Sequence, residues 1–407
     1  MNYSDAERIS AFLENSGFKK ANQMDEADLI LFMTCSVRQK AEDRIFGLAG
    51  KLKKLKENNS RLKIAITGCT AKLLGSEKLK KKMPVLDLVF DINDINALEK
   101  ILFLKKENKI QNFFEIFPET LNSFSAFVPI MTGCDNFCSY CVVPFARGRE
   151  KSREFNDIFD ECQKHVQKGK KELTLLGQNV NSYQHDFPLL LEKIADIPHL
   201  QRLRFTTSHP KDLSDRLIDV IKNKKNICKH IHLAVQHGDD QVLIAMNRKY
   251  TSSDFLKLLE KIRKKIPEIS ITTDLIVGFP GETEEQFQNL VSFYKEANFD
   301  LAYIAKYSPR PQTAAYKMND NVTLEEKRRR FKILDDLQKE IGFQKNKKFI
   351  GKTASVLVEN FTEKKSTGRT ECARAVEFKS KENLTGQIVE ISIKEAKEWV
   401  LVGESRN

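Results

Sequence analysis

Apolar and polar positions along the first hundred residues predict helices that alternate with short strands. A capping-box pair, Ser4 and Glu7, predicts the start of an amphipathic helix near the amino terminus. Apolar runs at 28–33 and 62–67 are typical of buried strands, and the charged segment 37–56 between them predicts a helix. Because strands that alternate with helices favour a parallel sheet, a parallel α/β domain is expected here.

A second alternation of strands and helices covers the middle of the chain. Its expected strands are the apolar runs near 126–132, 172–176, 202–206, 230–235, 270–277 and 300–305. A long charged helix is expected to follow them at 324–348. Repeated βα units on this scale predict a partial or full (β/α) TIM-like barrel.

The last part of the chain changes to the period-two alternation of strands. Segments 354–358, 387–393 and 399–402 show this pattern, which predicts a small antiparallel β-barrel. A polar stretch near 106–122 is expected to link the first two units. The predicted domains are the α/β domain 1–105, the (β/α) barrel 123–348 and the small β-barrel 349–405.

Composition narrows the class of protein without deciding its partner. The net charge of +12 and the pI of about 9.1 favour a nucleic-acid partner. The lysine runs at 51–54 and 80–82 also fit solvated helix faces encoded by a genome of biased base composition. No apolar run reaches the length of a membrane span, and no secretory signal opens the chain, so a cytoplasmic location is expected. In that compartment the eight cysteines are expected to be metal ligands or core thiols rather than disulfides.

Three cysteines on one short loop carry the strongest chemical signal. Cys134, Cys138 and Cys141 have C-x-x-x-C-x-x-C spacing and follow an apolar run at 126–132. The loop is therefore expected at the carboxyl end of a strand, where α/β proteins place their chemistry. Three thiolates leave one coordination position open, which fits a 4Fe–4S cluster better than a structural zinc site with four protein ligands. A zinc site completed from elsewhere in the fold remains an alternative.

Two further cysteines end the predicted strands of the first domain. Cys35 and Cys69 each follow an apolar run, and the ends of neighbouring parallel strands share one edge of a sheet. The two thiols could therefore converge on a second metal site. The alternative is that both are small buried core residues, a common environment for a free cysteine.

The cysteine loop resembles the cluster loop of radical S-adenosylmethionine (SAM) enzymes, and more narrowly that of the tRNA methylthiotransferases. The resemblance rests on segment 134–141, Cys-Asp-Asn-Phe-Cys-Ser-Tyr-Cys, and on 142–149 after it. It implies that Cys134, Cys138 and Cys141 hold the 4Fe–4S cluster that binds SAM. Segments 34–38 and 68–69 are similar to the family's auxiliary-cluster motifs, which implies a second 4Fe–4S cluster on Cys35 and Cys69.

The auxiliary cluster of this family takes three cysteines, and the first lies in a Gly-Cys-Gln-Met-Asn segment. This chain begins at Met1-Asn2, just after the place of that cysteine, and opens on a helix rather than on a strand. A start site assigned too far downstream is therefore expected. Gly-Cys-Gln is expected in frame upstream of Met1.

Further segments match the family in order along the chain. By resemblance, SAM and substrate contacts are expected at the residues that follow three of the barrel strands. These are Gly177, Gln178, Asn179, Ser208 and Gly278. Departures from the usual family residues at Ala234, His237, Lys249 and Gln312 concern substrate contacts rather than the reaction class. Cys162, Cys228 and Cys372 are interpreted as structural.

Segment 367–374 of the last domain resembles a TRAM domain, a small RNA-binding β-barrel. Arg369 and Arg374 are expected to contact phosphates, which would position RNA without reading its sequence. Without the resemblance, both could equally be solvated surface arginines.

The resemblance implies an enzyme that adds a methylthio group to carbon 2 of an N6-isopentenylated (dimethylallyl) adenosine next to the anticodon of tRNA. That carbon–hydrogen bond is not acidic, so a cofactor has to supply a radical while the protein orients it. The expected partners are tRNA and a reduced electron donor such as flavodoxin or ferredoxin, and the chain is expected to act as a monomer. Ser36-Val37-Arg38 after Cys35 favours this substrate over threonylcarbamoyladenosine. A non-catalytic, metal-loaded RNA-binding protein is the alternative from another class.

Overall fold

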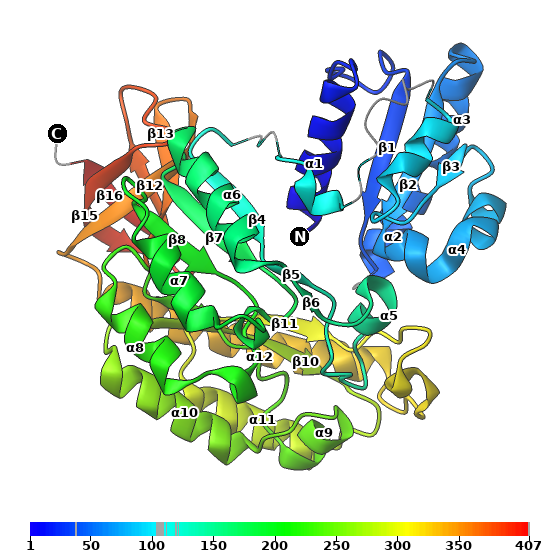
Figure 1. Ribbon diagram of the computed structural model, residues 1–407. Helices are drawn as coiled ribbons and strands as arrows, with labels where there is room; N and C mark the ends of the chain where they lie inside the picture. The colour runs from blue at the N-terminus through cyan, green and yellow to red at the C-terminus, as the bar shows by residue number, and fades with distance from the viewer. Residues whose placement is uncertain (37–38, 103–109, 111, 119, 121, 406–407) are drawn as a thin grey trace.

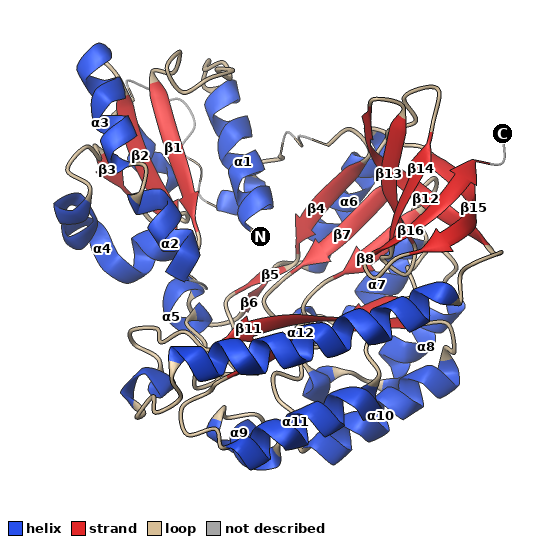
Figure 2. Cartoon of the chain, turned by 180° about the vertical axis from the view of Figure 1, so that it is seen from behind, coloured by secondary structure: helices blue, strands red, loops and turns tan. Residues whose placement is uncertain are grey.

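The computed structural model describes the chain except for residues 37–38, 103–109, 111, 119, 121 and 406–407. Its elements form three groups, an amino-terminal α/β unit, a central half-barrel of parallel strands and a carboxyl-terminal closed β-barrel (Figure 1). The predicted fold class is confirmed. In the view from behind, the amino-terminal unit and the small barrel stand over opposite sides of the central unit (Figure 2).

The amino-terminal unit is a three-stranded parallel sheet with helices packed against it. Its strands are in the order β1-β2-β3, and β1 pairs with β2 over six residues in register, from Leu29↔Lys63 to Thr34↔Gly68. Its elements are α1 Asn2–Asn15, β1 Leu29–Thr34, α2 Gln39–Phe46, α3 Ala49–Asn58, β2 Lys63–Gly68, α4 Cys69–Lys82 and β3 Leu88–Val89. Two apolar clusters cover the faces of this sheet and hold the helices to it.

Two expectations for this unit are wrong in detail. The helix α1 begins at Asn2 without a side-chain cap, and Ser4 and Glu7 are buried rather than capping it. Ser4 Oγ instead donates to the carbonyl of Phe127 in the central unit at 3.3 Å. The segment predicted as one helix over 37–56 forms the two helices α2 and α3. Val37 and Arg38, which supported the choice of substrate, lie outside the described residues.

Six parallel strands build the central unit. They form two runs, β4-β7-β8 and β9-β10-β11, which single bridges at Leu203↔Ile227 and Ser208↔Leu233 join. The strands are β4 Ser125–Pro129, β7 Glu172–Leu176, β8 Arg202–Phe205, β9 His230–His232, β10 Ser270–Val277 and β11 Leu301–Lys306, and the short pair β5 Met131–Thr132 and β6 Lys151–Ser152 flanks them. The predicted TIM-like barrel is therefore a partial one. The strand β9 is shorter than predicted, since only single bridges continue its pairing beyond His232.

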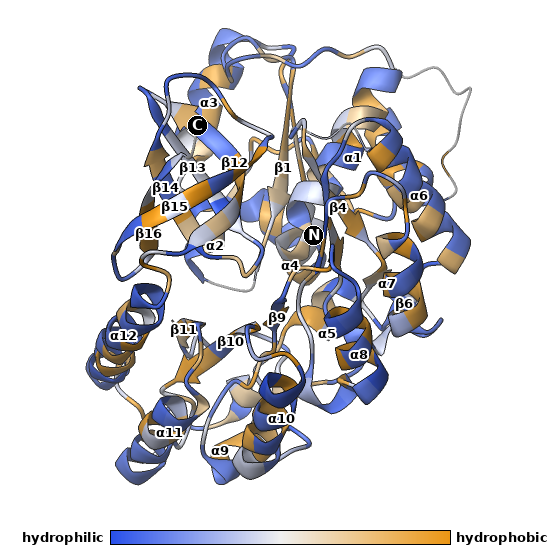
Figure 3. Ribbon diagram, turned by 90° about the vertical axis from the view of Figure 1, so that its left-hand side faces the viewer, coloured by the Kyte–Doolittle hydropathy of each residue, from blue (hydrophilic) through white to orange (hydrophobic). Residues whose placement is uncertain are grey.

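Helices cover the outer face of the half-barrel and enclose the largest apolar core of the chain. They are α6 Phe155–Gln167, α7 Phe187–Ala195, α8 Asp215–Asn223, α10 Ser252–Lys265, α11 Glu284–Ala297 and α12 Leu324–Lys347. The short helix α5 Val143–Arg147 packs against α4, and α9 Asp240–Ala245 contributes to a separate small apolar cluster. Each of α10, α11 and α12 buries only part of its surface. Both hydrophilic and hydrophobic stretches are accordingly seen on these helices in Figure 3. Short 3₁₀ helices lie at η1 Ile95–Lys100, η2 Phe113–Glu115, η3 Val180–Ser182, η4 Pro210–Asp212 and η5 Ala314–Lys317. None of the described helices is long and apolar enough to cross a membrane.

The carboxyl-terminal unit is a closed barrel with strand order β12-β13-β14-β16-β15. Its strands are β12 Thr353–Thr362, β13 Lys365–Thr370, β14 Ala375–Lys379, β15 Ile388–Ala396 and β16 Val400–Ser405. Alternate residues of these strands point inward and form a separate apolar core. The predicted small β-barrel is confirmed, with β13 and β14 as strands that the sequence pattern did not identify.

Candidate functional site

The three-cysteine loop lies between β5 and α5, where the chain leaves the strands of the half-barrel. Gly133 opens the loop with φ +78°, and a Cβ there would lie 2.1 Å from the carbonyl oxygen of Arg149. Only glycine allows this approach of two backbone segments. The amide of Cys134 donates to the carbonyl of Gly148 at 3.2 Å, which closes the loop at its base.

Each thiol of the loop has a defined surrounding. Asn136 Nδ2 donates to Cys134 Sγ at 3.4 Å, and Arg248 Nη1 donates to Cys138 Sγ at 3.3 Å. Burial raises the pKa of Cys134, while the hydrogen bonds of Asn136 oppose the increase. Burial, aided by the neighbouring Cys138, raises the pKa of Cys141 to about 12. Burial therefore favours the neutral thiols of Cys134 and Cys141 until a metal takes up the sulfur atoms and displaces their protons.

Arg248 is a site residue that the sequence did not reveal. It is 6% exposed, and besides Cys138 its guanidinium contacts the carbonyl of Ala234 and, at 2.7 Å, the hydroxyl of Tyr250. A buried guanidinium at a ligand sulfur stabilises negative charge there, and hydrogen bonds to cluster sulfurs tune reduction potential. Its position after Met246 and Asn247 gave no signal, because the loop between α9 and α10 shows no metal-binding pattern.

The donor set fits an iron–sulfur cluster better than a single ion. Within the described ranges, no group of three or more His, Cys, Asp or Glu side chains is placed to hold one metal ion. A cubane cluster distributes its three thiolates over three iron atoms, so it does not require them to converge on one point. Zinc would need a fourth protein ligand in a structural site.

Cys35 and Cys69 lie side by side at one edge of the amino-terminal sheet. They follow Thr34 and Gly68, which are paired in register on β1 and β2. The φ of Gly68 is +92°, and a Cβ there would lie 2.5 Å from the carbonyl oxygen of Thr34. The expected convergence of these two strand ends is therefore present.

Arg147 of α5 connects this edge of the sheet to the three-cysteine loop. Its guanidinium donates to Asp5 Oδ2 at 2.7 Å and to Asn2 Oδ1 at 2.9 Å. Burial raises the pKa of Cys69, and Arg147 opposes that rise through its charge and a hydrogen bond. One buried cation thus lies at Cys69, six residues along the chain from Cys141.

Of the residues expected to contact SAM, some have polar atoms without a partner, and others are engaged in contacts within the protein. Gln178 Oε1 and Ser208 Oγ are buried and lack hydrogen-bond partners in the described part of the chain, as expected of atoms that face a ligand. Asn179 is engaged internally, since its side chain donates to Asp212 at 2.8 Å and accepts from the amide of His209 at 3.0 Å. Gly177 is required by packing, because a Cβ would lie 2.6 Å from Met131 Cγ.

Comparisons with known proteins identify the family of this chain. Residues 1–91 match the model "Uncharacterized protein family UPF0004", and residues 128–294 match the Radical SAM superfamily. The tRNA-2-methylthio-N(6)-dimethylallyladenosine synthases of Thermoanaerobacter pseudethanolicus and Clostridium botulinum are each 41% identical to the chain. The aligned regions cover 99% of this chain, and 90% and 94% of those two proteins. The chain belongs to the radical SAM methylthiotransferase family.

Solved structures support the family's fold. The radical S-adenosylmethionine methyltransferase TsrM from Kitasatospora setae, with cobalamin and a 4Fe–4S cluster bound, superposes with a TM-score of 0.54 at 14% identity. The match covers 89% of this chain and 77% of that structure. At this identity the likeness concerns the fold alone.

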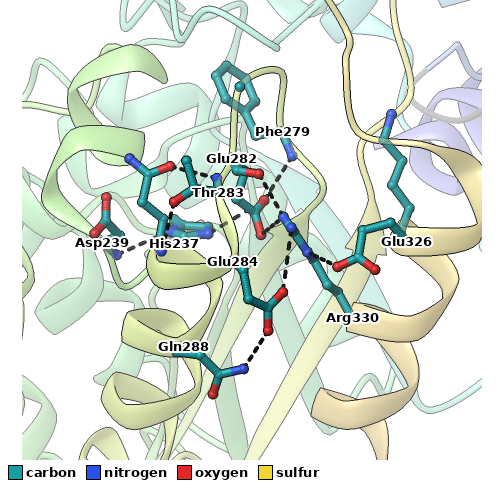
Figure 4. Close-up of polar contacts among 12 residues, drawn as sticks. His237, Asp239, Phe279, Glu282, Thr283, Glu284, Gln288, Glu326 and Arg330 are labelled. Carbon is teal, nitrogen blue, oxygen red and sulfur yellow. Dashed lines mark hydrogen bonds and ion pairs between the residues drawn. The ribbon is translucent and has the colours of Figure 1, made fainter.

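In this methylthiotransferase, Gly278 lies at the end of β10 in a loop that α12 holds from outside. A Cβ at Gly278 would lie 2.2 Å from Lys327 Cγ, so close packing by itself accounts for the glycine. Glu282 anchors the same loop (Figure 4). It accepts from the amide of Phe279 at 2.9 Å and pairs with Arg330 of α12 at 2.9 Å. His237 lies against it at 3.8 Å, so this departure from the usual family residue belongs to the anchor.

The hairpin β13–β14 carries the arginines that were expected to contact RNA, and the two differ in exposure. The side chain of Arg369 is 60% exposed, with a distant ion pair to Glu359 at 3.5 Å. Arg374 is 12% exposed and pairs with Asp300 at 2.5 Å, next to β11. Arg369 is therefore available to a polyanion, whereas Arg374 fastens the barrel to the central unit.

Proposed function

We propose that this chain adds a methylthio group to carbon 2 of N6-dimethylallyladenosine next to the anticodon of tRNA. The observation that carries the proposal is the 41% identity to dimethylallyladenosine methylthiotransferases over 99% of the chain. The three-cysteine loop and the paired strand-end cysteines lie in the two units that the family models match. A purely RNA-binding protein would not require either arrangement.

Cys134, Cys138 and Cys141 would hold a 4Fe–4S cluster with one open iron, and Gln178 and Ser208 would face the bound SAM. When bound, this cluster would supply the electron for the reductive cleavage of SAM. The chain's own part is to orient the reactants and exclude water. Arg248 keeps Cys138 in place, and the Glu282–Arg330 anchor fixes the loop after β10.

Cys35 and Cys69 would hold the auxiliary 4Fe–4S cluster, the source of the sulfur that is transferred. The auxiliary cluster of the family takes three cysteines, and Cys35 and Cys69 would supply two of them. Arg147 would offset negative charge at Cys69, which a cluster bound by thiolates accumulates.

Transfer RNA is the proposed substrate, and an adenosine beside the anticodon lies in a single-stranded loop where a base can be turned outward. A reduced flavodoxin or ferredoxin is the proposed electron donor. We propose that the enzyme works as a monomer in the cytoplasm. Arg369 is the proposed contact to the RNA backbone.

The test compares Cys134→Ala with Cys162→Ala, a cysteine of the apolar core in α6, after anaerobic reconstitution with iron and sulfide. We expect the wild type and the Cys162→Ala control to be brown, to release 5′-deoxyadenosine from SAM under a reductant, and to methylthiolate a dimethylallyl anticodon stem–loop. Cys134→Ala is expected to lose deoxyadenosine formation and part of its iron. A colourless, zinc-loaded wild type that never cleaves SAM would overturn the proposal.

A further inference from the structure

Four polar side chains form a row on the inner wall of the half-barrel, on the neighbouring strands β9 and β10. His230 Nε2 lies 3.0 Å from Thr272 Oγ1, and Thr272 Oγ1 lies 3.0 Å from His232 Nδ1. His232 Nε2 in turn lies 3.0 Å from Asp274 Oδ2. The row is continuous and ends on a carboxylate.

The row is anchored at Asp274. Its carboxylate can only accept, so His232 Nε2–H donates to it. The hydroxyl of Thr272 bridges the two imidazoles through His232 Nδ1 and His230 Nε2. Burial lowers the pKa of His230 to about 3, so that ring stays neutral. The row holds Asp274 in one orientation through Oδ2.

A cavity of about 570 Å³ extends along the inner wall and is lined by His230 and Thr272 of the row. Thr272 lines this cavity, and Asp274, two residues further on the same strand, faces the same side. The side chain of Asp274 is 39% exposed, and no partner of its Oδ1 is found among the described residues. One oxygen of a fixed carboxylate is therefore available to a ligand.

The cavity is lined by exposed aromatic side chains of the half-barrel and extends to the carboxyl-terminal barrel. Tyr303, paired in register with Asp274 on β11, is 50% exposed, and Phe127 of β4 is 38% exposed. Both line the cavity, and so does Arg369 of the proposed RNA-contacting hairpin. A base that leaves an RNA loop held at this hairpin would meet aromatic faces on its way in, and bases stack on such faces.

We propose that Asp274 is a substrate-binding residue that accepts the remaining N6–H of the dimethylallyl-adenine, with His232 and Thr272 as positioning residues. The inference rests on the proposed function and adds a specificity determinant to it. N6 substituted with one dimethylallyl group keeps a single N–H donor, while the ring nitrogens N1, N3 and N7 only accept. A carboxylate can pair with that donor alone, and it repels the anionic threonylcarbamoyl group.

The neighbourhood supports a neutral, apolar substituent. Tyr303 and Phe127 offer apolar area, and Asp274 has no Arg or Lys ion-pair partner in the described part of the chain. A site built to hydrogen-bond one N–H discriminates strongly against an analogue that lacks it, because its acceptor is then left unpaired. The hydroxyl and amino groups of SAM could also donate to Asp274, so SAM is the alternative ligand for its free oxygen.

The test uses Asp274→Ala, the isosteric Asp274→Asn, and Asp215→Ala on the exposed face of α8 as control. Reconstituted holoenzyme is given two anticodon stem–loops, one with N6-dimethylallyladenosine and one in which N6 also carries a methyl group and so lacks the N–H. We expect the wild type and the control to prefer the first by about 10- to 100-fold in kcat/KM. Asp274→Ala is expected to bring this ratio close to one, mainly through KM for the stem–loop, with an unchanged KM for SAM.

Asp274→Asn keeps the shape of the site, so it tests the carboxylate even if the alanine variant unfolds. We expect an intermediate ratio from it, because the amide keeps one acceptor oxygen, without charge, in place of the two that His232 and N6–H share in the wild type. Retention of the wild-type ratio in both variants would overturn the inference while leaving the function intact, and so would a rise confined to KM for SAM. A wild type that cleaves SAM but methylthiolates neither stem–loop would overturn the proposed function instead, and with it the inference.

Discussion

At the scale of single residues, glycines shape both cysteine sites by allowing backbone segments to approach. Gly133 lies against the carbonyl of Arg149, and Gly68 lies against that of Thr34, both at positive φ. The sequence shows that these positions are glycine, but not which backbone group each one meets. That partner belongs to the packing of a distant segment, so only the structure gives the reason for the residue.

Gly133→Ala is expected to lower the free energy of unfolding by about 2 kcal/mol through overpacking and to reduce iron bound at the loop. The control is Gly148→Ala in the same loop, where φ is +81° but no atom lies within 4 Å of the added Cβ. Denaturant unfolding and iron analysis of the two variants separate steric overlap from backbone strain. Equal losses in both would show that strain alone accounts for the effect.

At the scale of elements, the strands and their parallel arrangement could be predicted, whereas the start of α1 could not. Apolar runs such as those of β1, β2 and β10 are long enough to be recognised, and the rule that parallel strands end at one edge placed Cys35 beside Cys69. The helix α1 was predicted from a local capping pattern, but Ser4 is used for a contact with the central unit. Tertiary packing overrode the local preference, which a single sequence cannot show.

The helix α1 joins α6 through a buried ion network, which predicts a pH-dependent interface. Arg8 pairs with Glu161, which also accepts from Arg153 at 2.7 Å. Burial opposes ionisation of Glu161, but His165, Arg153 and Arg8 outweigh it and lower its pKa to about 2. The lowered pKa stabilises the folded state above about pH 4.5, and this contribution is lost as the pH falls towards 2.

Glu161→Gln is expected to destabilise the protein by about 3 kcal/mol at pH 7, because Arg8 then remains buried without its counter-charge. The difference from wild type is expected to shrink as the pH falls from 4.5 towards 2. Denaturant unfolding of both proteins across this range measures it. A difference that stays constant with pH would contradict the assignment of the effect to the ionised carboxylate.

At the scale of the whole molecule, arginines of the half-barrel hold the carboxyl-terminal barrel in place. Arg202 donates to the carbonyl of Arg369 at 2.8 Å, and Arg204 donates to the carbonyl of Thr370 at 2.8 Å. The backbone of segment 367–374, which resembles the TRAM domain, is thus fixed by the central unit. The sequence predicted the three units but not these contacts, since β8 and β13 lie far apart along the chain and no local pattern records their meeting.

This docking separates the roles of the two arginines of the motif. Arg369→Ala is expected to weaken tRNA binding uniformly across sequences and to reduce the slope of log affinity against log salt by about one, with little change in stability. Arg374→Ala leaves Asp300 with Lys345 as its remaining basic partner and is expected to cost about 2 kcal/mol of unfolding free energy. Binding titrations at several salt concentrations, with melting curves on the same samples, distinguish the two. If Arg374→Ala lowered the salt slope without loss of stability, both arginines would be RNA contacts and the inter-unit ion pair would be dispensable.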